Sequence, residues 1–264
     1  MEPVNADRLR WGALAWLLTL QFFVVETLAQ SRYEGSYSRA DDVISALGSA
    51  DSAAHQLMNA SFVVQAALIL TGALLLRPVL LHGAGQVALV LLGSAAVGVL
   101  LVGIFPTDGN PLLHAIGAVA YLLGGALGLI ALAYAVRPRS EVVGTTLALL
   151  GMVGTAATVF FLTGVTEYLG EGGTERVAAY VLPLGLTVAV TRLWRLAVPR
   201  AVDRPDRRAE REAARVDRAA RARERDAALE ASARRGGTTD PGDTADPGAA
   251  EPDDHWAPVE RRRD

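Results

Sequence analysis

Residues 84–105 read AGQVALVLLGSAAVGVLLVGIF, and this stretch decides the fold class. It contains no charged residue and no proline, and its apolar residues lie all round a helix instead of along one stripe. A helix rises about 1.5 Å per residue, so about 20 apolar residues cross a hydrocarbon core of about 30 Å. The stretch therefore predicts a transmembrane helix.

Five further stretches have a similar length and apolar character. The first of them contains Gln21 and Glu26 and is longer than the apolar region of about 7 to 15 residues in a cleaved signal peptide, which favours a retained helix. The sequence thus predicts an all-α, polytopic membrane helical bundle with six transmembrane helices. The predicted spans are 11–30, 57–76, 84–105, 113–136, 142–166 and 177–197.

The arginines that flank these spans predict the orientation. Cytoplasmic flanks of membrane proteins carry the excess of arginine. If the N-terminus is cytoplasmic, the cytoplasmic flanks contain Arg8, Arg10, Arg77, Arg137, Arg139, Arg192, Arg195 and Arg200. The outer flanks then contain only Arg32, Arg39 and Arg176, with many carboxylates. We therefore expect the N and C termini to be cytoplasmic.

The distribution of charge predicts four segments. Residues 1–10 form a short cytoplasmic N-terminus, and 11–197 form the six-helix transmembrane domain with an extracytoplasmic loop at 31–56. Residues 198–235 are rich in Ala, Arg and Glu and predict a charged cytoplasmic helix. Residues 236–264 are rich in Gly, Pro, Thr and Asp and predict a disordered tail. The charge-balanced tail predicts contact with anionic lipid or a cytoplasmic protein, and no nucleic acid.

Small residues four positions apart predict how the helices pack. Such pairs let helix backbones approach closely in a membrane. We expect them to pack helices within one chain, and they assign no oligomeric state. The pairs are Gly124 with Gly128, Ser94 with Gly98, and Gly151 with Thr155.

Polar residues in or beside the spans gather at the predicted outer side. Ionisable residues in a membrane are costly, by about 2.5 to 3.5 kcal/mol on insertion scales, and are candidates for function. Taken singly, each has a structural explanation: Glu26 could reach the interface, Asn59 could cap a helix, and His114 could donate to a carbonyl. Taken together, they predict either a site for a lipid headgroup or small ligand or a set of contacts that locks the loops over the bundle. The candidate residues are Asp42, Ser45, Asn59, Asp108, His114, Glu175 and Arg176.

The residue types limit the chemistry of this site. The chain has no Cys, only four His and no pair of histidines one helical turn apart, so we expect no metal and no cofactor. A non-catalytic binding protein is favoured. One alternative is a membrane-embedded hydrolase, whose metal-dependent form would use His114, Asp108 and either Glu175 or Asp42. The other is a small-solute transporter with a path lined by Gln21, Gln65 and Gln86.

Four short motifs follow one another in the order typical of a known family. They are DVIS at 42–45 with LG at 47–48, MN at 58–59 with Phe62, GIFP at 103–106 with Asp108 and His114, and GTER at 173–176. The chain resembles DUF998, a family of bacterial and archaeal membrane proteins of unknown function, over residues 11–197. The resemblance implies a six-helix fold. We expect a multi-pass protein of the bacterial plasma membrane, with membrane lipids as partners. The resemblance implies no established activity.

Overall fold

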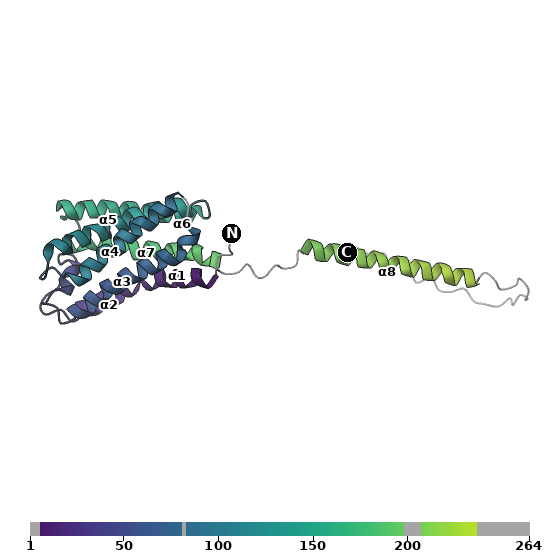
Figure 1. Cartoon of the computed structure of the whole chain (residues 1–264), viewed down its shortest axis with the longest axis horizontal. Coiled ribbons are helices and arrows are strands. Elements are labelled where there is room, and N and C mark those ends of the chain that lie inside the picture. The colour runs from purple at the N-terminus through teal and green to yellow at the C-terminus, as the bar shows by residue number, and fades with distance from the viewer. Residues whose placement is uncertain (1–5, 81–82, 198–206, 237–264) are drawn as a thin grey trace, which may run out of the picture. The chain divides into compact units, whose positions relative to one another are not determined.

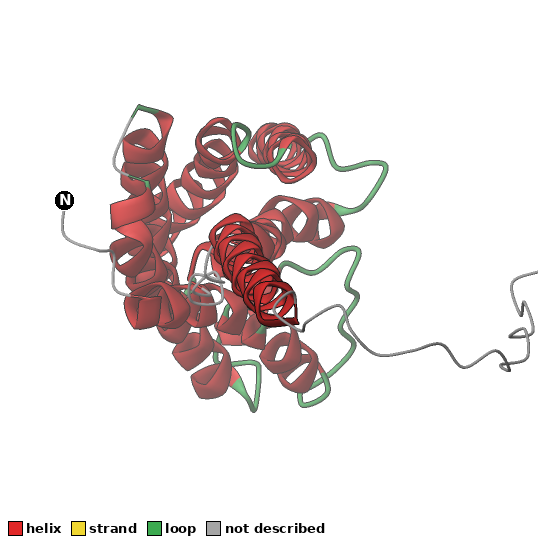
Figure 2. Cartoon of the chain, turned by 90° about the vertical axis from the view of Figure 1, so that its right-hand side faces the viewer, coloured by secondary structure: helices red, strands yellow, loops and turns green. Residues whose placement is uncertain are grey.

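The computed structural model describes residues 6–80, 83–197 and 207–236, and the regular elements of this part of the chain are helices (Figure 1, Figure 2). One compact unit, Met1–Val202, contains the first nine elements, and a second, Asp203–Asp264, contains the last. The predicted disordered tail lies outside the described residues, apart from Gly236. The elements are α1 (Ala6–Leu18), α2 (Gln21–Gln30), the 3-10 helix η1 (Ile44–Gly48), α3 (His55–Leu76), the 3-10 helix η2 (Arg77–Val79), α4 (Ala84–Ile104), α5 (Pro111–Val136), α6 (Glu141–Thr163), α7 (Glu171–Ala197) and α8 (Arg207–Gly236).

The predicted all-α polytopic bundle is confirmed. Within the described residues, five helical segments are long and apolar enough to cross a membrane: Ala6–Gln30, His55–Val79, Ala84–Ile104, Pro111–Val136 and Glu141–Thr163. The predicted sixth span, 177–197, lies within α7, which already begins at Glu171. The count of six spans and their orientation remain predictions.

The first predicted span corresponds to the helical segment Ala6–Gln30, which a turn divides into α1 and α2. Its helical hydrogen bonds stop at Thr19 and Leu20, between α1 and α2. The Thr19 hydroxyl donates to the Trp16 carbonyl at 2.6 Å, and Phe22 N–H donates to the Thr19 carbonyl three residues back. A helix bends where a side-chain hydroxyl donates a hydrogen bond to one of its backbone carbonyls. It also bends where backbone hydrogen bonds join residues three apart instead of four.

The ends of α5 and α6 follow from local sequence signals. Asn110 caps α5 by accepting a hydrogen bond from Leu113 N–H at 3.1 Å, and Pro111 follows in the first turn, where no N–H is needed. Ser140 caps α6 in the same way, and Gly164 ends it with a φ of 73°, which favours glycine.

Helix α7 closes the bundle. Consecutive long helices pack side by side from α3 to α7, and α7 also packs against α1 and α5 (Figure 1). On α4, Val90 is 73% exposed and Val97 is 56% exposed, whereas Leu92 and Ala95 are fully buried. Exposed aliphatic side chains of this kind suit a lipid solvent, because lipid tails are as apolar as they are.

Glycines set the close approach of α4 and α5. A Cβ on Gly98 would lie 2.4 Å from Tyr121 N, and one on Gly117 would lie 2.7 Å from Gly98 O. One on Gly124 would lie 2.9 Å from Leu91 O. The small residues noted in the sequence thus pack helices within one chain, as expected.

We expect Gly98→Ala to lower the free energy of unfolding by about 1–3 kcal/mol, because the new methyl group forces two backbones apart. Gly93→Ala on the same helix is the matched control, since nothing lies within 4 Å of its Cβ position. This control should be neutral or stabilising by up to about 1 kcal/mol, the helix preference of Ala over Gly. Thermal unfolding of both purified proteins in one detergent measures the difference. Equal melting temperatures would refute the close approach.

Candidate functional site

A loop over residues 31–54 covers one end of the bundle, called here the loop end. The rings of Tyr33 and Tyr37 pack 5.1 Å apart, and Tyr33 forms an isolated antiparallel bridge with Ser52. Ile44 and Leu47 of η1 are buried in the protein core at 3% and 0% exposure. The loop therefore folds against the helices.

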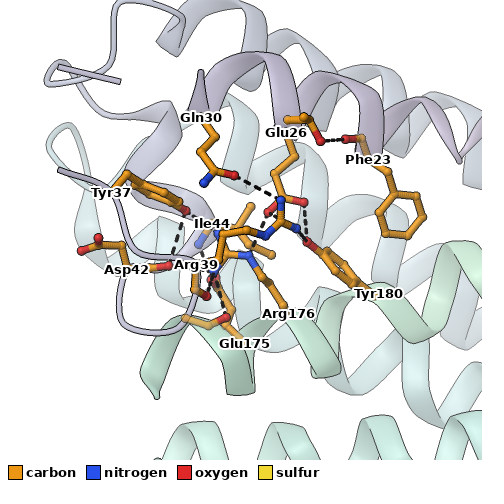
Figure 3. Close-up of polar contacts among 12 residues, drawn as sticks. Phe23, Glu26, Gln30, Tyr37, Arg39, Asp42, Ile44, Glu175, Arg176 and Tyr180 are labelled. Carbon is orange, nitrogen blue, oxygen red and sulfur yellow. Dashed lines mark hydrogen bonds and ion pairs between the residues drawn. The ribbon is translucent and has the colours of Figure 1, made fainter. Parts of the chain in front are cut away.

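Arg176, near the start of α7, ties this loop to the bundle (Figure 3). Its side chain is buried, and its Nε donates to Glu26 Oε1 at 2.9 Å. Nη2 donates to the hydroxyl of Tyr37 at 2.5 Å. Nη1 donates to three backbone carbonyls, those of Arg39 at 2.7 Å, Asp42 at 2.8 Å and Gly172 at 3.0 Å. Every nitrogen of the guanidinium is therefore engaged inside the protein.

Glu26 of α2 supplies the countercharge and is 1% exposed. Besides the ion pair with Arg176, it accepts a hydrogen bond from the Tyr180 hydroxyl at 2.5 Å and lies 3.6 Å from Arg39 Nη2. Arg39 in turn donates to Tyr180 at 2.6 Å. We call this set, Glu26, Tyr37, Arg39, Arg176 and Tyr180, the clasp. A buried charge pair persists only when its remaining hydrogen bonds are satisfied, and the clasp meets that condition.

Tyr37 serves the clasp as a neutral phenol. Burial raises the pKa of Tyr37 to about 12, although the nearby Arg176 opposes this rise. The hydroxyl therefore keeps its proton at neutral pH and donates it to the Val43 carbonyl at 3.0 Å. It accepts from Arg176 at the same time, so one side chain links α7 to two points of the loop.

Glycines bring the start of α7 against the loop backbone. A Cβ on Gly172 would lie 2.0 Å from the Asp42 carbonyl oxygen, and one on Gly170 would lie 2.2 Å from that of Ala40. Gly173 N–H donates to the Ala40 carbonyl at 2.8 Å. This contact explains why Gly170 and Gly172 precede the GTER motif. Larger side chains at these two positions would keep the loop backbone away from Arg176.

Asn59 and Asp108 fasten the rest of the loop from two other helix ends. Asn59 of α3 donates through Nδ2 to the Gly48 carbonyl at 2.8 Å, so it bridges to η1 and does not cap its own helix. Asp108, between α4 and α5, accepts from Ala50 N–H at 2.9 Å. Both side chains therefore bind loop backbone.

Ser45, His114 and Glu175 share a different feature, a cavity of about 280 Å³ between α5, α6, α7 and the loop. They also line an adjoining cavity of about 30 Å³ that extends toward Tyr121. The other residues that line the larger cavity are mostly apolar. Glu171 is the second acidic residue of the lining, after Glu175. The apolar lining residues are Val43, Ala115, Ala118, Val119, Leu122, Phe161 and Leu162.

The hydrogen bonds of these three side chains leave atoms free to meet a ligand. His114 Nδ1 lies 2.9 Å from the Phe105 carbonyl, which can only accept, so Nδ1 carries hydrogen and the neutral ring keeps a lone pair on Nε2. Glu175 Oε2 accepts from Ile44 N–H. Ser45 is 9% exposed, and its hydroxyl has no partner in the described part of the chain.

The seven predicted residues thus lie at one end of the bundle but divide among different tasks. Ser45, His114 and Glu175 line the cavity, whereas Asn59 and Asp108 hold the loop. Arg176 belongs to the clasp, and Asp42 contributes its backbone carbonyl there while its carboxylate accepts from Ser38 N–H at 2.7 Å.

Sequence reasoning missed part of the clasp. Glu26 was noted as an intramembrane carboxylate, but its partner was not found, and it does not reach the interface alone. Tyr37, Arg39 and Tyr180 were not candidates at all. The signal that was available was charge: a carboxylate within a predicted span calls for a cation, and Arg176 opens another span at the same level.

The geometry gives little support to the two alternatives, a membrane-embedded hydrolase and a small-solute transporter. Within the described residues, no group of three His, Asp or Glu side chains could hold a metal ion. No hydrogen bond joins Ser45 to His114 in the same part of the chain. Gln21 donates to Gln65 at 3.3 Å and accepts from Ser61 at 3.0 Å, but Gln86 is exposed on α4. The three glutamines therefore do not line one path.

We expect Glu26→Gln to lower the free energy of unfolding by about 3 kcal/mol, because it leaves the Arg176 cation buried without a countercharge. The loop should loosen with it, so amide hydrogen exchange at Ile44 and Gly173 should accelerate. Glu34→Gln is the matched control, since Glu34 is exposed in the same loop. A Glu26→Gln protein that melts and exchanges like the control would show that the clasp does not hold the loop.

Residues 17–192 match the family model described as "Protein of unknown function (DUF998)". No curated protein and no solved structure matches the chain. The family match runs from the end of α1 to near the end of α7 and contains the clasp and the cavity. The chain belongs to the DUF998 family.

Proposed function

We propose that this membrane protein binds an amphiphile in the cavity between α5, α6 and α7, with the polar head of the ligand beside Ser45, His114 and Glu175. The observation that carries the proposal is the two-part lining of that cavity. Polar side chains lie at the loop end, and apolar side chains continue from there along α5. Ala118 and Leu122 follow His114 by one and two helical turns, about 6 and 12 Å deeper.

The size and the rim of the cavity support a ligand that is partly embedded in lipid. A volume of about 280 Å³ lies just below the usual range of about 300–1,000 Å³ for small-molecule sites. It holds a head group and the first part of a chain. Ala115 and Leu162 of the lining are exposed on the outside of the bundle, so the rest of a chain can lie against apolar helix surface.

The clasp supports this function indirectly. It fixes the loop that carries Ser45, and therefore one wall of the cavity, without placing a clasp residue in the lining. A rigid loop supplies a preformed site, which lowers the entropic cost of binding. We propose the plasma membrane of a bacterium as the location, with membrane lipids as the source of the amphiphile.

Filling the cavity tests the proposal. Ala118→Leu places a larger side chain in the lining, and we expect it to reduce lipid binding about tenfold, which corresponds to about 1.4 kcal/mol. Ala156→Leu is the matched control, because Ala156 is exposed on α6 and does not line this cavity. Native mass spectrometry of the proteins in one detergent, titrated with lipid, measures the bound fraction. If both variants bind as much lipid as the original protein, the cavity is not the site.

A further inference from the structure

The charges in the cavity restrict the head group that it can bind. Its charged lining residues are Glu171 and Glu175, and no arginine belongs to the lining. The chain contains no lysine. A head group with a net negative charge would therefore meet two acidic side chains and no arginine in the lining, which is an unfavourable arrangement.

Arg176, the next residue after Glu175, does not line the cavity and makes its hydrogen bonds elsewhere. Its side chain is 5% exposed, and all three of its nitrogens donate to Glu26, Tyr37 and backbone carbonyls. Glu175 itself forms no ion pair within the described residues; its recorded hydrogen bond comes from Ile44 N–H. Burial raises the pKa of Glu175 to about 7, and the nearby Arg176 opposes this rise only in part. A further cation beside Glu175 would therefore stabilise its charged form.

Ser45, His114 and Glu175 each offer an acceptor to the cavity, and the hydroxyls of Ser45 and Thr107 can also donate. Glu175 keeps Oε1, the neutral ring of His114 keeps the lone pair on Nε2, and the Ser45 hydroxyl has two lone pairs. A primary ammonium group has three N–H donors and no acceptor. Its hydrogen-bonding capacity and its charge both match this lining. A trimethylammonium group matches the charge but has no N–H to donate.

We infer that the cavity selects an amphiphile with a primary ammonium head, of the kind that ethanolamine lipids carry. The inference rests on the proposed function, because it assumes that the cavity is the binding site. Glu175 supplies the countercharge, and Ser45 and His114 accept the remaining N–H groups. Glu171, which is exposed, adds negative potential at the rim.

A competition among lipids tests the inference. Purified protein in detergent is given equal amounts of phosphatidylethanolamine, phosphatidylcholine and phosphatidylglycerol with the same acyl chains. Native mass spectrometry then counts each bound lipid by mass. The ethanolamine lipid should be bound preferentially, and Glu175→Gln should reduce that preference about fivefold, the ratio that corresponds to about 1 kcal/mol. Gln retains an acceptor for Ile44 N–H, so the loop contact is kept.

Two further variants make the result specific. Glu167→Gln removes one carboxylate from the exposed segment before α7 and should leave the preference unchanged. Ser45→Ala removes an acceptor without changing charge, and it should lower the ratio of ethanolamine to choline lipid even if Glu175→Gln folds poorly. An unchanged preference in both Glu175→Gln and Ser45→Ala would overturn the assignment of these side chains.

Other outcomes separate the two proposals. If the original protein binds the three lipids equally, or prefers the glycerol or choline lipid, the ammonium inference is wrong while the cavity proposal stands on the Ala118→Leu result. If Ala118→Leu also binds lipid normally, the cavity proposal itself fails. Free ethanolamine should not displace bound lipid, because it lacks a chain. Displacement would show that the site binds a soluble amine, and it would overturn the proposal that the ligand is an amphiphile.

Discussion

A buried ion pair between Glu26 and Arg176 joins three segments that are far apart in the sequence: α2, the loop over 31–54 and the start of α7. Two charges removed from water cost several kcal/mol each unless their hydrogen bonds are completed within the protein. Tyr37, Tyr180 and three loop or helix carbonyls complete them here. This network holds the loop over the end of the bundle together with Asn59 and Asp108.

The same network explains why the neighbouring cavity is acidic. Successive residues on a helix point about 100° apart, because a turn contains 3.6 residues. Arg176 therefore turns into the clasp, and Glu175 turns toward α5 and the cavity. The positive charge of Arg176 is balanced by Glu26 on one side of α7. Glu175, which forms no ion pair within the described residues, lies on the other side. The two adjacent residues thus have different surroundings, since Arg176 lies in the clasp and Glu175 lines the cavity.

Tight helix packing and the cavity are complementary features of this bundle. Gly98, Gly117 and Gly124 let α4 and α5 approach until backbone meets backbone. Around Ala118, the same helix α5 instead leaves a space toward α6 and α7 at the loop end. Without a hydrophobic force between helices in lipid, close packing has to supply the attraction. A cavity in such a bundle forgoes contacts that packing could have made, which fits a place reserved for a ligand.

The sequence by itself determined the helices and the end at which the polar residues gather. Uninterrupted apolar stretches such as 84–105 leave only a helix as a membrane-compatible backbone, since every N–H and C=O must be paired within the segment. Short connections then bring Asn59, Asp108, His114 and Glu175 to the same end.

The tertiary structure alone decided the partners. Local periodicity does not reveal that Glu26 meets Arg176 across 150 positions, or that Thr19 breaks the first span. Which of two neighbouring side chains enters a cavity depends on the rotation of α7 against α2 and α5, and long-range packing sets that rotation. The clasp and the cavity therefore became visible only when the helices were placed together, because their contacts join segments whose separation in sequence carries no signal.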